Sequence, residues 1–128
     1  QHNILVLTTD YQGADANTSI ATFGGAYNDF GNCVRQTGDG GYIIVGSKLS
    51  QSTTDEDVWV LKLTPDLSTE WDKTYGGNSG DFGTSISQTK DGGYIITGNT
   101  YSYGNQSEII LLKITGDGVV QDFSGTSK

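Results

Sequence analysis

Pairs of acidic residues are the first candidates for chemistry in this sequence, because two carboxylates facing one glycosidic bond can hydrolyse it. Asp29 and Asp81 both stand in the triplet Asp-Phe-Gly, and Asp39 and Asp91 both open an Asp-Gly-Gly triplet. Each pair is therefore one position in two copies of a segment, and its members are expected in different structural units. We predict that these four aspartates cap turns by accepting hydrogen bonds from backbone N–H groups, and we find no convincing catalytic pair.

A run of three carboxylates, Asp55, Glu56 and Asp57, is the second candidate, because oxygen-rich loops can hold calcium. The Asp-x-Asp-x-Asp-Gly spacing typical of a calcium loop is absent, and the corresponding segment of the next copy keeps only Glu108. A solvated, charged loop is the simpler interpretation. We predict no metal site and no cofactor, while calcium binding at this loop stays an open alternative.

Covalent catalysis lacks its usual partners. The only histidine is His2, close to the N-terminus, where we expect disorder, and the only cysteine is Cys33. A Ser-His-Asp arrangement needs a histidine beside its nucleophile, and Cys33 has none to activate it. The next copy carries Ser85 in the place of Cys33, as expected of a small packing residue. We predict that the protein is not an enzyme.

Carbohydrate binding is the best specific activity that the sequence offers. The segment Tyr101-Ser-Tyr103-Gly-Asn105 places two aromatic rings beside an amide, and flat rings stack on sugar faces while amides hydrogen-bond to hydroxyls. Trp59 and Trp71 also occur only in the first full copy. The alternative is that the tyrosines cover a neighbouring strand and the tryptophans fill a core. A sugar site at Tyr101, Tyr103 and Asn105 is therefore the second hypothesis for function.

Composition limits the class of protein and of partner. The chain has 128 residues, enough for one domain, and its formal net charge of −8 argues against binding to nucleic acid. Nineteen glycines, one proline and 34% hydrophobic residues are typical of short strands joined by glycine turns. The longest apolar runs, such as Ile109 to Leu112, fall far short of the roughly 20 residues of a membrane span.

Two features favour a location outside the cell. The sequence contains no methionine, so we expect that a leader was removed or that the chain is a piece of something longer. Asn17-Thr-Ser and Asn105-Gln-Ser are sequons, which makes Asn17 and Asn105 candidates for glycosylation. We predict an extracellular or cell-surface protein.

An internal repeat in the sequence indicates which structural elements position these residues. QTGDGGYIIVG at 36–46 returns as QTKDGGYIITG at 88–98, 52 positions later, and the match extends upstream to Thr22 and Thr74. A partial third copy starts at Ile4 and aligns with the segment from Ile109. The single domain, 1–128, therefore divides into a partial repeat at 1–21 and full repeats at 22–73 and 74–128.

Each full repeat predicts four short extended segments, with an Asp-Gly-Gly hairpin turn between the first two. The second and third segments are continuously apolar, which predicts burial on both faces of the sheet. No segment has helical periodicity, so the fold class is all-β. The expected segments are Asn32–Thr37, Tyr42–Ser47, Val58–Leu63 and Thr69–Tyr75, then Thr84–Thr89, Tyr94–Thr100, Ile109–Ile114 and Val119–Ser124.

Four-stranded antiparallel units with a period of roughly 40–50 residues are typical of propeller blades. The combination Thr-Tyr/Phe-Gly-Gly, Gln-Thr-x-Asp-Gly-Gly-Tyr-Ile-Ile-x-Gly and Leu-Lys-x-Thr resembles the β-propeller repeat found in tandem in secreted and cell-surface proteins of bacteria and archaea. The resemblance covers nearly the whole chain and implies propeller-like blades, two complete and one partial. The chain departs from that pattern at Ala14–Ser19 and in Phe123 near the usual tryptophan, for Trp71 aligns with Asp122 or Phe123.

The number of copies is the largest departure from that family. Closed propellers use about 4–8 blades, so two and a half blades would leave apolar faces and strand edges open to water. Several chains could assemble into a ring or filament, the chain could be part of a longer array, or the fold could close as a small sandwich. We expect a structural protein that associates with copies of itself, and surface glycans are the partner under the second hypothesis.

Overall fold

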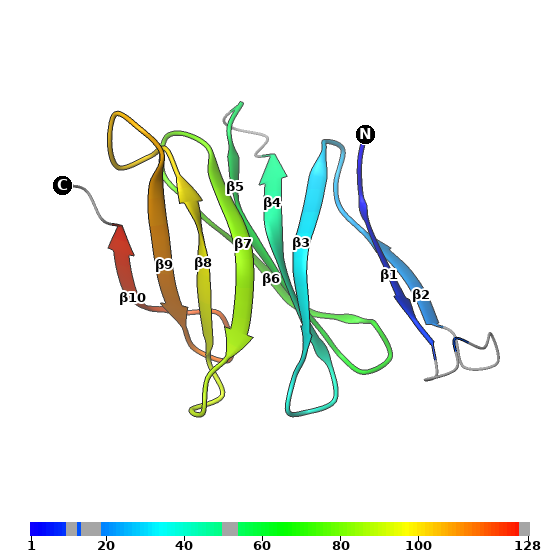
Figure 1. Cartoon of the computed structure of the whole chain (residues 1–128). Coiled ribbons are helices and arrows are strands. Elements are labelled where there is room, and N and C mark those ends of the chain that lie inside the picture. The colour runs from blue at the N-terminus through cyan, green and yellow to red at the C-terminus, as the bar shows by residue number, and fades with distance from the viewer. Residues whose placement is uncertain (10–12, 14–18, 50–53, 126–128) are drawn as a thin grey trace.

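The computed structural model describes residues 1–9, 13, 19–49 and 54–125. Within these residues the protein contains ten strands and no helix, which confirms the all-β prediction. Figure 1 shows the strands arranged as sheets that follow one another in chain order. The strands are β1 (Ile4–Thr8), β2 (Ser19–Phe23), β3 (Asp29–Gln36), β4 (Tyr42–Leu49), β5 (Glu56–Leu63), β6 (Thr69–Tyr75), β7 (Asp81–Gln88), β8 (Tyr94–Thr100), β9 (Glu108–Ile114) and β10 (Val120–Gly125).

The strands form a two-stranded hairpin and two four-stranded antiparallel sheets. β1 pairs with β2, the first sheet has the order β3-β4-β5-β6, and the second has the order β7-β8-β9-β10. The prediction of four-stranded antiparallel units is therefore confirmed. The described residues form an open stack and not a closed ring: the second sheet covers one face of the first, and the hairpin covers the other (Figure 1).

The strand registers reproduce the internal repeat. Gly31 pairs with Gly46 ahead of a bulge in β3, and Gly83 pairs with Gly98 ahead of the same bulge in β7. Ile4 pairs with Phe23 as Val58 pairs with Tyr75, so β1 and β2 correspond to the third and fourth strands of a sheet. The partial copy thus lacks counterparts of the first two strands within the described residues.

The same comparison fixes the position of the tryptophan. Lys62 pairs with Trp71 and the equivalent Lys113 pairs with Asp122, so Asp122 takes the place of Trp71 in the second sheet.

The Asp-Gly-Gly turns are built alike in both sheets. Gly40 and Gly92 adopt φ of 83° and 81°, which side chains other than glycine rarely tolerate. The N–H of Gly40 donates to the carbonyl of Thr37 at 2.9 Å, and Gly92 repeats this bond to Thr89 at 3.0 Å. These hairpins join β3 to β4 and β7 to β8.

Two apolar clusters hold the three sheets together. The larger lies between the two four-stranded sheets, where fully buried residues of β4 and β5 meet residues of β7, β8 and β9. The smaller lies between the first sheet and the hairpin, with Trp59, Leu61 and Leu63 packed against Ile4 and Val6. The first sheet is therefore buried on both faces, as its continuous apolar strands predicted.

The second sheet is buried on one face only, so the prediction for its strands is wrong. Buried and exposed residues alternate along β8 and β9, where Ile110 and Leu112 are fully buried but Ile109 is 67% exposed. The physical reason is that within the described residues nothing packs on the outer face of this sheet. Its apolar sequence nevertheless resembles that of a sheet covered on both sides.

No helix that could cross a lipid bilayer occurs in the described part of the chain.

Candidate functional site

Asp29 and Asp81 are buried at the start of the first strand of each sheet, where they cap turns as predicted. Asp29 Oδ2 accepts the N–H of Gly25 at 2.6 Å, and Asp81 Oδ2 accepts the N–H of Gly77 at 2.8 Å. Asp81 also accepts a hydrogen bond from Ser102 Oγ at 2.8 Å. The two carboxylates belong to different sheets, and each accepts hydrogen bonds from the turn ahead of its own strand.

Asp39 and Asp91 also act within their turns. Each accepts hydrogen bonds from a threonine hydroxyl and a glycine N–H, and these bonds lower the pKa of Asp91 to about 2 and that of Asp39 further. A lysine from the third strand completes each group: Lys62 lies 3.0 Å from Asp39, and Lys113 lies 3.2 Å from Asp91. These aspartates hold the hairpin to the neighbouring strand.

Asp57 of the acidic run lies beside buried Asp81. A Cβ at Gly76 would contact the carboxylates of both residues, so the two groups flank the same backbone segment. Burial, the charge of Asp81 and the charge of Asp55 raise the pKa of Asp57. Among the described residues no three His, Cys, Asp or Glu side chains are arranged to hold a metal ion. What the structure places here is a repulsive pair of acids between the two sheets.

Cys33 and His2 have packing partners. Cys33 is half-buried against the core between the sheets, with its Sγ 4.0 Å from the carbonyl of Ile86. His2 donates its backbone N–H to Asn28 at 3.0 Å and its ring lies 5.6 Å from that of Phe30. These contacts place His2 beside β3.

The predicted sugar-binding residues lie in the loop between β8 and β9. Tyr101 is 50% exposed and packs edge-on against Phe82. Tyr103 is 41% exposed, and burial together with Asp81 and Asp57 raises its pKa. Asn105 is exposed, as both a sugar contact and a glycosylation site require, whereas Asn17 lies outside the described residues.

The two tryptophans are structural. Trp59 is 2% exposed in the core beneath the hairpin, and its Nε1 donates to Asp72 at 3.2 Å. Trp71 lies half-buried on β6, with its ring edge-on to that of Tyr94 in the second sheet. Trp59 is therefore too buried to stack on a sugar, and Trp71 takes part in the contact between the two sheets.

One set of contacts was missed by sequence reasoning. Three β6 side chains donate hydrogen bonds to carbonyls of the turn between β9 and β10: Trp71 to Gly116 at 3.1 Å, Lys73 to Asp117 at 2.9 Å and Tyr75 to Gly118 at 2.6 Å. Burial, with the charge of Asp117, raises the pKa of Tyr75 to about 12, so its hydroxyl stays a donor. Backbone acceptors leave no trace in sequence; only the restriction of Trp71 to one copy hinted at this contact.

The two ends of the stack expose different apolar faces of the repeat. At the C-terminal end, Ile109 and Leu111 are 67% and 40% exposed, although their equivalents Val58 and Val60 are fully buried between the sheets. At the N-terminal end the hairpin exposes three aliphatic side chains: Leu5 is 63% exposed, Leu7 55% and Ile20 67%. Each end thus presents the apolar face that an adjacent sheet covers elsewhere in the chain.

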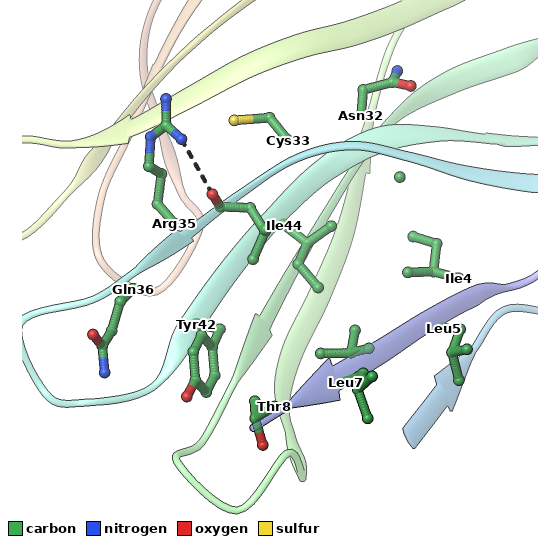
Figure 2. A pocket seen from close by; sticks show the side chains of 13 residues that line it. Ile4, Leu5, Leu7, Thr8, Asn32, Cys33, Arg35, Gln36, Tyr42 and Ile44 are labelled. Atoms are coloured by element: carbon green, nitrogen blue, oxygen red, sulfur yellow. Dashed lines mark hydrogen bonds between the residues drawn. The ribbon is translucent and has the colours of Figure 1, made fainter. Parts of the chain in front are cut away.

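A groove separates the hairpin from the first sheet. It has a volume of about 440 Å³ and is lined by the length of β1, by β3 from Gly31 to Gln36, and by Tyr42 and Ile44 of β4. Figure 2 shows Ile4 on the side of β1 that faces β3 and β4. β1 pairs with β2 along one edge only, so the groove follows an edge of β1 that is unpaired in the described structure.

Comparison with known proteins adds no assignment: no protein-family model matches the sequence, and no curated protein matches it.

Proposed function

We propose that this chain is a non-enzymatic structural protein of the cell surface or extracellular space, whose propeller-like sheets associate head to tail into a ring or filament. The observation that carries the proposal is the exposure of Ile109 and Leu111, because their equivalents Val58 and Val60 form the buried contact between the two sheets. A monomer leaves this apolar surface open to water, whereas a second copy can cover it.

The location rests on the resemblance to repeats of secreted and cell-surface proteins and on the two sequons. The mode of association follows from the two ends, which are different surfaces. A contact between different surfaces is heterologous, so it continues until a ring closes or a filament grows.

Light scattering on the purified chain tests the proposal. We expect a mass several times the 13.6 kDa of one chain. Ile20→Lys blocks the N-terminal end and the double variant Ile109→Lys, Leu111→Lys blocks the C-terminal end, so each alone is expected to be monomeric. Mixed together, they are expected to form a 1:1 dimer through the one remaining pair of ends. A compact wild-type monomer at high concentration would refute the proposal.

Carbohydrate binding is the second candidate, favoured by the exposure of Tyr101, Tyr103 and Asn105 within one loop. A glycan array probed with the wild-type chain and with Tyr101→Ala and Tyr103→Ala tests it. Binding to a defined glycan that both substitutions weaken would support a lectin role. Absence of binding to every glycan would retire it.

A further inference from the structure

The free edge of β1 faces a space that another strand fills elsewhere in the same chain. β1 corresponds to β5, which pairs with β6 on one edge and with β4 on the other, over eight residue pairs from Tyr42–Leu63 to Leu49–Glu56. β1 pairs only with β2 among the described residues, and the groove runs along its other edge. The groove therefore occupies the place where a counterpart of β4 would lie.

Equivalent residues on the two sides of the first sheet show what is missing. Ile86 of β7 is 1% exposed because β4 and β5 cover it, whereas the equivalent Val34 of β3 is 51% exposed in the groove. A Cβ at Gly83 would contact Val45 of β4 and Val58 of β5. At the equivalent Gly31, the three atoms nearest to an added Cβ all belong to Ile4, the counterpart of Val58.

The polar groups show the same difference. Gly38 lies in the turn between β3 and β4. In the contact between the two four-stranded sheets, its N–H donates a hydrogen bond to Gln88 Oε1 at 2.9 Å. The equivalent Gln36 lines the groove and is exposed. Its side chain is placed to accept the same N–H from the turn of an incoming hairpin.

We propose that the groove binds a β-hairpin with the chemistry of this chain's own β3–β4 unit, whose second strand pairs antiparallel with the free edge of β1. The occupant needs aliphatic side chains at the positions of Ile43 and Val45, because these residues fill the corresponding contact between the sheets. An Asp-Gly-Gly turn places its N–H group against Gln36. The inference rests on the proposed function and names the partner of this edge: a neighbouring repeat of the same type.

A synthetic peptide of residues 29–49 with Cys33→Ser tests the proposal in trans. The acceptor is the full chain carrying Ile109→Lys and Leu111→Lys, which cannot associate head to tail, so binding at the groove is read separately from assembly. We expect NMR shift changes at Val34 and Gln36 and a slowing of amide exchange along β1 by about tenfold or more at saturating peptide.

The peptide itself supplies matched controls. Ile43→Ser with Val45→Ser removes the side chains expected to face the first sheet, and we expect this peptide to bind at least about tenfold more weakly. Ile44→Ser changes the opposite face of the same strand, and we expect binding to be retained. Equal binding of the two variants, or shift changes confined to the outer face of the second sheet, would overturn the proposal.

A covalent version guards against a peptide that does not fold alone. In this variant a second copy of residues 81–107 is joined directly ahead of Asn3. Asn3 corresponds to Glu108, so the added hairpin precedes β1 just as β7 and β8 precede β9. We expect a higher melting temperature and protected amides in β1, and a smaller gain when Ile95→Asp is introduced in the added copy. An unchanged melting temperature and unchanged amide exchange would refute the hairpin site. The light-scattering experiment tests head-to-tail association independently of this result.

Discussion

The first sheet makes two contacts, one with the hairpin and one with the second sheet. Equivalent positions are used in both, but the large side chain lies in the turn at one contact and in the facing strand at the other. Against the hairpin, the large residue lies in the turn: Leu67 is 5% exposed and adopts φ of 64°, facing a strand that carries Ser19 at the position of Trp71. Against the second sheet, the turn has Gly118 instead, and a Cβ there would lie 3.1 Å from the Trp71 ring.

This difference shows that a repeat motif fixes the strands of each sheet but not the packing between sheets. A leucine at φ of 64° costs roughly 1–2 kcal/mol of backbone strain, which burial of its side chain offsets at roughly 2 kcal/mol. Gly118 avoids the strain and makes room for hydrogen bonds from Trp71 and Tyr75. Each contact is complementary only to its own partner.

The largest expected effect separates Gly83 from Gly31. Gly83→Ala places a methyl group against Val45, 3.0 Å from Val58 Cγ1 and 3.1 Å from the carbonyl of Gly46, and we expect a loss of about 2–3 kcal/mol in the free energy of unfolding. In Gly31→Ala the three atoms nearest to the new methyl group all belong to the Ile4 side chain, at 3.0–3.4 Å and with no backbone among them, so we expect less than about 1 kcal/mol. Urea titration followed by circular dichroism measures both, and equal losses would show that the two contacts are alike.

The next effect concerns Trp71. Trp71→Ala removes a half-buried ring packed on Tyr94 and the hydrogen bond to Gly116, with an expected loss of about 2 kcal/mol. Trp71→Phe keeps most of the packing and is expected to lose about 1 kcal/mol. Ser19→Ala at the equivalent position is the control and should stay within about 0.5 kcal/mol. Similar losses for Trp71→Ala and Ser19→Ala in urea titrations would contradict the assigned role.

A smaller difference is expected between Lys62 and Lys113. Lys62 is 3% exposed and lies within 3.0 Å of both Asp39 and Glu70, while the side chain of Lys113 is 23% exposed. Burial opposes the charge of Lys62, but the hydrogen bonds that its ammonium group donates to Glu70 and Asp39 outweigh this effect and raise its pKa.

Lys62→Met leaves two carboxylates that water still reaches, so we expect a loss of about 1–2 kcal/mol, well below the cost of stranding a buried charge. Lys113→Met should lose less than about 0.5 kcal/mol. Thermal unfolding of the two variants side by side checks this, and a larger loss for Lys113→Met would reverse the comparison.

The smallest effect is a gain. The pKa of Asp57 is raised in the folded state, so folding favours its protonated form, and stability is lost as the pH rises through its ordinary value of 3.8 toward the raised one. Asn3 occupies the equivalent position in the hairpin contact and carries no charge. Asp57→Asn should therefore raise stability near pH 7 by roughly 0.5 kcal/mol, with the gain vanishing below about pH 3. A gain that is independent of pH would exclude the acid pair as its cause.

The sequence predicted the strands because the repeat shows each of them twice. The Asp-Gly-Gly turn and the apolar runs from Tyr42 and Tyr94 locate two hairpins, and the partial copy at Ile4 identifies β1. The small number of copies predicted that some apolar face would stay open, but the strands did not show that it belongs to the second sheet, since its composition matches that of a covered face. Burial there depends on a neighbouring sheet, and not on the residues themselves.

The candidate site was less accessible to prediction. Tyr101 and Tyr103 were found from their types and spacing. The partial repeat predicted an open strand edge, but the groove beside β1 also depends on how the hairpin stacks on the first sheet in the described residues, which no local pattern reveals. The contact of Trp71 with Gly116 involves a backbone carbonyl 45 residues away. Such partners are set by the stacking of sheets and leave no signature in either segment.

The exchange of Leu67 for Gly118 also affects how the chain avoids misfolding. Hairpins as similar as β5–β6 and β9–β10 could trade places during folding, since each would find nearly the same partners in the other's sheet. In the swapped order Gly118 would face the β1–β2 hairpin in place of Leu67, and the smaller apolar core would be left with a void. The difference in size between Leu67 and Gly118 therefore favours the native order of the sheets over the swapped one.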